Sequence, residues 1–121
     1  MAAPNIVNVS SIYGKTTQVQ LTTSSTSNRL VCPSNKVLKI NTILVANEHT
    51  ADITVEAKFY DASAFTSRTF ASDVNVPVES TLVLISKDTA LYLEEGDAIR
   101  CGASVTAVSN MLISYEEIDD A

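Results

Sequence analysis

One run of nine residues, 52–60, alternates between polar and apolar side chains and constrains the fold of this chain more than any other stretch. On one side of the alternation lie Ile53, Val55, Ala57 and Phe59, and on the other lie Asp52, Thr54, Glu56, Lys58 and Tyr60. This period of two is typical of a half-buried β-strand, whereas the helical period would scatter the same apolar residues around a cylinder. The run therefore predicts a strand, and residues 37–46 and 81–86 are its expected partners in a central antiparallel sheet.

The rest of the chain predicts further short strands separated by turns. We expect strands at residues 15–22, 29–32, 36–47, 67–77, 81–86, 91–93, 98–103 and 111–118. Residues 33–35 favour a hairpin turn, Gly96 favours a turn with a positive φ, and residues 72–73 mark a bulge. Eight or nine strands at this spacing, with no helical stripe, predict an all-β, single-domain antiparallel β-sandwich over residues 1–121. Jelly-roll connections are among the topologies that fit.

Two of these strands are apolar on both sides, which predicts self-association. In residues 36–47, strict alternation puts Leu38, Ile40, Leu44 and Ala46 on one face and Val37, Lys39, Asn41, Ile43 and Val45 on the other. Residues 81–86 are apolar on both faces as well. One small domain has too few layers to cover every face. The outer faces are therefore expected to present four residues to another subunit of a homo-oligomer, namely Ile43, Val45, Val83 and Ile85.

The two ends of the chain differ in charge. Residues 2–14 carry no charged side chain, yet they include Ile6, Val7, Val9, Ile12 and Tyr13. We expect residues 1–13 to be either an arm that pairs with a neighbouring subunit or an ordinary first strand of the sandwich. At the opposite end, residues 116–121 include Glu116, Glu117, Asp119 and Asp120. A solvated acidic tail is the favoured interpretation, and a charged end for ordered docking is the alternative.

Charge and hydropathy exclude several classes of partner. The net charge of −6 argues against nucleic acid, because phosphate binding needs a basic face. The longest apolar runs, residues 43–46 and 82–85, are too short to cross a bilayer, so no membrane partner is expected. Residues 1–5 lack the basic start and the apolar stretch of a secretory signal, which predicts assembly in the cytoplasm.

No motif places a catalytic group or a cofactor, so we expect a non-enzymatic protein. The chain has three glycines and one histidine, His49. Its sequence contains neither a glycine-rich phosphate-binding motif nor a nucleophile motif. Cys32 and Cys101 lie on apolar alternations and are expected as buried, reduced thiols rather than a disulfide. The acidic residues around Gly96 predict a hairpin turn, with a loose calcium site as the less favoured alternative. No metal site is expected.

Four segments carry a family resemblance. They read NIVNVSSIYGKT at residues 5–16, LISKDT at 84–89, YLEEGD at 92–97 and ISYEEI at 113–118. Together they resemble small structural proteins encoded by tailed phages of marine bacteria, cyanophages among them. Residues 61–73 carry the least of this resemblance.

The resemblance implies a component of the virion. Small β-sandwich chains in that setting often decorate or cement capsid shells, so the expected partners are the major capsid protein or other virion proteins at the capsid surface. A neck, tail or fibre component is the alternative. From a different class comes a glycan-binding β-sandwich module that uses the turn at residues 94–97. A trimer would suit three-fold sites of a capsid lattice, although the sequence does not fix the number of subunits.

Overall fold

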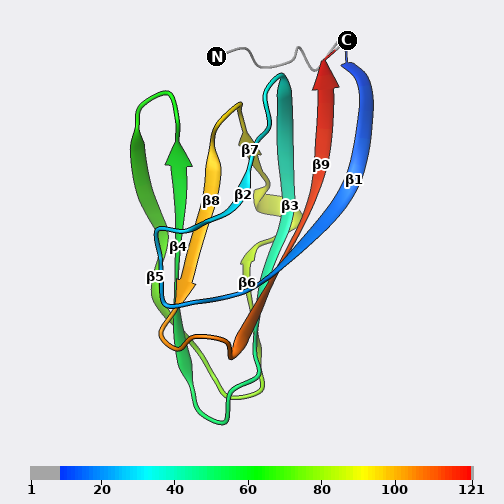
Figure 1. Cartoon of the computed structure of the whole chain (residues 1–121). Coiled ribbons are helices and arrows are strands. Elements are labelled where there is room, and N and C mark those ends of the chain that lie inside the picture. The colour runs from blue at the N-terminus through cyan, green and yellow to red at the C-terminus, as the bar shows by residue number, and fades with distance from the viewer. Residues whose placement is uncertain (1–8, 121) are drawn as a thin grey trace.

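The computed structural model describes residues 9–120, which contain nine β-strands and one 3₁₀ helix joined by turns and loops (Figure 1). The strands are β1 (Val9–Gln20), β2 (Asn28–Val31), β3 (Lys36–Asn47), β4 (Ile53–Asp61), β5 (Thr66–Val76), β6 (Thr81–Ile85), β7 (Leu91–Leu93), β8 (Ala98–Ala103) and β9 (Ser109–Asp120). The helix η2 (Lys87–Thr89) lies between β6 and β7. The predicted all-β fold is confirmed.

The strands form two antiparallel sheets that face each other. Sheet A has the order β1-β9-β3-β6, with β7 pairing to the other half of β3, and sheet B has the order β2-β8-β4-β5. In Figure 1, sheet A lies on the right and sheet B on the left. If β6 and β7 are taken as one strand position, these two orders are those of a jelly roll. The sequence predicted a sandwich but was compatible with several topologies. The structure shows that the topology is the jelly roll.

The core lies between the two sheets, and the alternation of residues 52–60 locates one side of it. Ile53, Val55 and Ala57 are buried, whereas Thr54 and Glu56 are partly exposed. The expected neighbours of this strand were wrong, because β4 pairs with β5 and β8. Residues 37–46 and 81–86 pair with each other in the opposite sheet. A one-sided pattern identifies the buried face of a strand, but it does not distinguish a neighbour in the same sheet from a layer across the core.

A bulge in β3 overturns the strict alternation that the sequence predicted there. The register with β9 passes from Ile40↔Tyr115 to Thr42↔Ser114, so Asn41 is an extra residue on β3. One extra residue moves every later side chain to the opposite face. The fully buried residues of β3 are therefore Leu38 and Ile40 before the bulge, and Ile43 and Val45 after it.

The bulges in β3 and β6 also change which residues lie on the outer face. Ile43 and Val45 are fully buried in the core, so their placement on an outer face was wrong. In β6, the register passes from Ile43↔Ile85 to Leu44↔Val83, which makes Leu84 an extra residue. Ile85 is consequently buried as well, whereas Val83 lies on the outer face.

Both ends of the described chain belong to sheet A. From Ser11 to Gln20, β1 pairs with β9 without interruption, so residues 9–13 of the expected arm form an ordinary first strand. Ile6 and Val7 lie outside the described residues. The acidic end is not a solvated tail, because residues 116–119 continue β9 between β1 and β3. Pairing on both sides fixes the positions of Glu116, Glu117 and Asp119.

Three turn predictions can be compared directly with the backbone. Gly96 has a φ of +86°, as expected for that turn. The bulge near residues 72–73 is confirmed, because the register of β4 with β5 shifts there and Asp73 has a φ of +46°. Residues 33–35 do turn the chain, with Asn35 at a φ of +62°. They connect β2 in sheet B to β3 in sheet A, however, and therefore do not form a hairpin.

Candidate protein-contact face

The outer face of sheet A carries three successive cross-strand rows without a charged side chain. The register of the strands defines the rows, which we call the neutral face. Its central row is Gln18, Leu112, Leu44 and Val83, and the flanking rows are Gln20, Asn110, Ala46 and Thr81 on one side and Thr16, Ser114 and Thr42 on the other.

The centre of the neutral face is apolar and accessible. Val83 is 54% exposed and Leu112 is 38% exposed, and the partly exposed Leu44 lies between them. Leu44 is the register partner of both, so the three side chains are direct cross-strand neighbours. Side chains that are apolar, contiguous and exposed on a sheet are a candidate surface for contact with another protein.

Charge borders this face on two sides. Asn110 Nδ2, in one flanking row, donates a 2.8 Å hydrogen bond to Glu48 Oε2, and two charged residues lie in the row next to Thr16, Ser114 and Thr42. There Lys39 and Glu116 are register partners of opposite sign, and Glu116 accepts a hydrogen bond of 3.0 Å from Asn41 Nδ2. The row after that is apolar, with the register partners Ile12, Ile118 and Val37. Over these five rows the side chains of opposite charge balance, although the whole chain has a net charge of −6.

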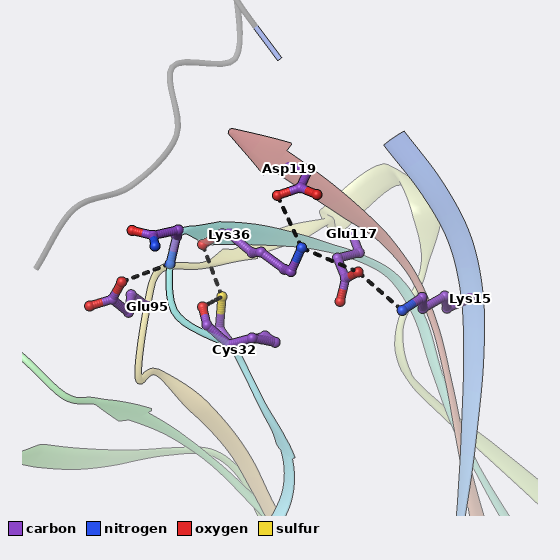
Figure 2. Close-up of polar contacts among 8 residues, drawn as sticks. Lys15, Cys32, Lys36, Glu95, Glu117 and Asp119 are labelled. Atoms are coloured by element: carbon purple, nitrogen blue, oxygen red, sulfur yellow. Dashed lines mark hydrogen bonds and ion pairs between the residues drawn. The ribbon is translucent and has the colours of Figure 1, made fainter. Parts of the chain in front are cut away.

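Four other charged residues of the long strands are directed to the inner side of sheet A and are paired there, namely Lys15, Lys36, Glu117 and Asp119. Figure 2 shows Lys15 and Lys36 approaching Glu117 from its two sides. Lys15 Nζ lies 3.0 Å and Lys36 Nζ lies 3.9 Å from Glu117 Oε2, and Lys36 Nζ also lies 3.0 Å from Asp119 Oδ1. The hydrogen bond to Asp119 is the main cause that raises the pKa of Lys36 above its ordinary value.

The outer face of sheet B is built differently. Lys58 and Arg100 are register partners on β4 and β8, and both have partners nearby. Lys58 Nζ lies 4.0 Å from Glu56 Oε1, while the Arg100 guanidinium lies 4.1 Å above the Tyr60 ring. Arg100 Nε also donates a hydrogen bond of 2.7 Å to Asn28 Oδ1. This face keeps its charges on the outside, where Lys58 pairs with Glu56 and Arg100 contacts two uncharged neighbours.

Part of sheet B is also covered by the loop between β1 and β2. A Cβ atom built on Gly102 would lie 2.6 Å from the backbone oxygen of Ser24. The loop backbone thus rests directly on β8, at a position where only glycine fits. On sheet A, by contrast, a Cβ built on Gly14 would have nothing within 4 Å.

The structure separates the nine predicted interface residues into three groups. Ile12, Tyr13 and Val83 are about half exposed, and their role in an interface stays a prediction. Ile43, Val45 and Ile85 lie in the core, as corrected above. Ile6 and Val7 lie outside the described residues, as does the side chain of Val9.

Sequence reasoning missed Leu44 and Leu112. Leu44 was hidden by the bulge at Asn41, which strict alternation does not anticipate. Leu112 carried a usable signal, because it is an apolar residue between the buried Met111 and Ile113, where alternation calls for a polar one.

In the acidic turn at residues 94–97, the carboxylates of Glu95 and Asp97 accept hydrogen bonds from the protein's own backbone. Asp97 is buried, its Oδ1 accepts a 3.0 Å hydrogen bond from the Ala62 amide, and its Oδ2 accepts one of the same length from the Glu94 amide. Glu95 accepts a 2.8 Å bond from the Asn35 amide. Within residues 9–120, no three or more His, Cys, Asp or Glu side chains gather as a metal site would need. The geometry therefore favours a structural turn.

Both cysteines are free and buried. Burial raises the pKa of Cys32 to about 11, and the thiol lies 3.2 Å from the carbonyl oxygen of Lys36 (Figure 2). Burial likewise raises the pKa of Cys101 to about 12. These are the properties of structural thiols, since the thiolate is the reactive form.

The comparisons with known proteins give no family for this chain. No family model matches its sequence, and no curated protein matches it. The described chain has no helix with the length and hydropathy that crossing a bilayer requires.

Proposed function

We propose that this chain is a non-enzymatic structural protein of a tailed-phage particle, and that it decorates or cements the head by binding the assembled shell. The observation that carries the proposal is the neutral face, where four strands present three rows of uncharged side chains around Leu44, Val83 and Leu112. The sequence resemblance described above supplies the setting, and the jelly roll is a fold that viral capsid domains use.

The neutral face has the composition of a protein interface. Charged residues are depleted at the centre of such interfaces, and a packed apolar centre surrounded by polar residues is the usual arrangement. Here the apolar centre is flanked by Gln, Asn, Ser and Thr side chains. These flanking groups can form hydrogen bonds with a partner without the cost of desolvating a charge. The major capsid protein, or another protein of the particle, is the proposed partner.

The size of the face limits what one copy can bind. Four strands about 4.8 Å apart and three rows about 6.8 Å apart cover on the order of 400 Å². A stable interface of standard size buries about 800 Å² on each partner. One neutral face alone is therefore expected to bind weakly, and stable attachment needs additional surface or more than one copy.

Imaging of purified phage particles tests the proposal. Density for this chain at regular lattice points over the head supports decoration, while density at a single vertex or along the tail replaces it with the neck or tail alternative. Absence of the chain from purified particles overturns a structural role altogether.

A matched pair of variants tests whether the chain binds the particle through the neutral face. Leu112→Lys places a charge at the centre of that face and is expected to lower the occupancy of the chain on particles strongly. Asn75→Lys places the same charge on the outer face of sheet B, where Asn75 is exposed, and is expected to leave occupancy unchanged. Circular dichroism of both variants verifies that they fold. Equal occupancy of the two variants would contradict a role for the neutral face.

A further inference from the structure

The described edges of the two sheets differ in how well they are protected against pairing with another strand. In sheet B, β2 has only four residues, and β5 is interrupted by two register shifts and by the positive φ of Asp73. In sheet A, β6 and β7 have five and three residues and are separated by η2. Short strands and bulges are devices that prevent edge-to-edge pairing.

β1 has none of these devices between Ser11 and Gln20. It spans twelve residues, its only register shift lies between Val9 and Ser11, and it runs along the margin of sheet A (Figure 1). Its one charged residue is Lys15, and that charge is paired with Glu117 on the inner side. Among residues 9–120, no strand pairs with the other edge of β1.

The hydrogen-bond pattern shows which backbone groups point to this free edge. The Leu21 amide, directly after β1, donates to the Ser109 carbonyl at 2.9 Å. Because bonding and non-bonding positions alternate in an antiparallel ladder, the odd-numbered residues of β1 bond to β9. The even-numbered residues direct their amide and carbonyl groups to the free edge, and they are Ile12, Gly14, Thr16, Gln18 and Gln20.

We propose that β1 pairs antiparallel with β1 of a second copy of this chain about a two-fold axis, which joins the two copies of sheet A into one continuous sheet. Antiparallel pairing of identical strands is self-complementary and closes as a dimer. Charge restricts where two copies can meet, because two chains of net charge −6 repel each other except where their surfaces are locally neutral. On the edge of β1, the only charge is already compensated.

Joining the two copies of sheet A also enlarges the neutral face, whose area limits the binding of a single copy. Two neutral faces side by side cover about 800 Å², which is what one partner contributes to an interface of standard size. This consequence rests on the proposed function, since it concerns how the dimer would bind a particle. The dimer itself does not depend on it and is measured on the isolated protein.

The first experiment combines sedimentation with amide hydrogen exchange on the full chain. The wild-type protein is expected to sediment as a dimer at micromolar concentration. The amides of Ile12, Gly14, Thr16, Gln18 and Gln20 are then expected to exchange more slowly as dimer forms. A monomer throughout that range, or a dimer in which these amides remain unprotected, overturns the proposal.

Two variants with the same substitution distinguish the edge from the face. Thr16 and Thr81 are both exposed on the outer face of sheet A and both lie on edge strands, β1 and β6. Thr16→Lys brings two like charges together near the middle of the paired edges and is expected to weaken the dimer about tenfold or more. Thr81→Lys is expected to leave it unchanged. Equal weakening by both substitutions would show that the copies stack through their faces, and would overturn edge pairing.

A proline variant tests the backbone bonds without adding charge. Thr16→Pro removes one amide that faces the free edge and leaves the odd-numbered bonds to β9 in place, so the monomer is expected to fold and the dimer to be lost. A Thr16→Pro chain that folds and still dimerises contradicts the proposal. The outcomes are independent of the proposed function: a monomer found on particles refutes only edge pairing, and a dimer absent from particles refutes only the virion role.

Discussion

The outer faces of the two sheets belong to the same pleated architecture, yet they treat charge in opposite ways. On sheet B, the charged residues Glu56, Lys58 and Arg100 point outward and are paired with neighbours on the same face. On sheet A, three rows of the outer face have no charge, although the strands that form it are not poor in charged residues. Lys15, Lys36 and Glu117 lie on the same strands, but they point to the inner side.

The difference shows that an uncharged face can result from the direction of side chains and not only from composition. On a face with its own ion pairs, the charged groups already have partners. Covering such a face with another protein is expected to add little binding free energy, because exposed pairs contribute little to stability or binding. A neutral face with exposed leucine and valine side chains gains by being covered. Three predictions test this comparison, beginning with the largest expected effect.

The first prediction tests the bulge that directs Leu44 outward. Ile43→Ala removes a fully buried side chain and is expected to lower the free energy of unfolding by about 2–5 kcal/mol. Leu44→Ala, one residue later, is expected to lower it by about 1 kcal/mol or less, because Leu44 is partly exposed. Urea denaturation measures both. A larger loss for Leu44→Ala than for Ile43→Ala would mean that the alternation continues through Asn41 and that Leu44 is not an outer-face residue.

The second prediction compares one glycine on each sheet. Gly102→Ala is expected to destabilise the fold by about 1–3 kcal/mol, because the new methyl group would overlap the loop backbone at Ser24. Gly14→Ala has open space and is expected to stabilise the fold by about 0.5–1 kcal/mol, since glycine is unfavourable inside a strand. Thermal denaturation at low protein concentration checks both. A tolerated Gly102→Ala would indicate that the loop does not cover sheet B.

The third prediction concerns the charges directed inward on sheet A, and its effect is the smallest. Because the folded-state pKa of Lys36 is raised above its ordinary value of 10.5, the ion pairs contribute their full stability below that pH. The contribution is lost as the pH rises through the raised pKa. Lys36→Met lacks this contribution, so its unfolding midpoint is expected to fall less than that of the wild type in this alkaline range. Parallel curves for the two proteins would contradict a stabilising role for the Lys36 pairs.

Much of the fold was predictable from local patterns, and the two predictions that failed did so for different physical reasons. The ends of β3 and β8 were predicted to the residue, since alternation and turn residues act within a few positions. Side-chain direction after Asn41 was not predictable, because a bulge reverses it without any change in composition. The neighbours of β4 were also missed, since strand pairing depends on the layer to which each segment belongs.

The candidate contact face was predictable in part for the same reasons. Val83 was found from the two-sided apolar run, and Leu112 could have been found as an apolar residue at a polar position. Glu117 could not have been placed, because its partner Lys15 lies 102 positions away in the chain. Only the three-strand register of β1, β9 and β3 brings these groups together.

The two buried thiols can report local unfolding of this protein. Because Cys32 and Cys101 are shielded in the folded chain, a thiol-specific reagent can modify them only when the structure around them opens. Cys32 lies beside the start of β3, and Cys101 lies in the middle of β8, so their separate labelling rates would time the opening of two different parts of the sandwich. A cysteine introduced on the surface would be labelled at once, which allows a probe to be attached there while both native thiols stay unmodified.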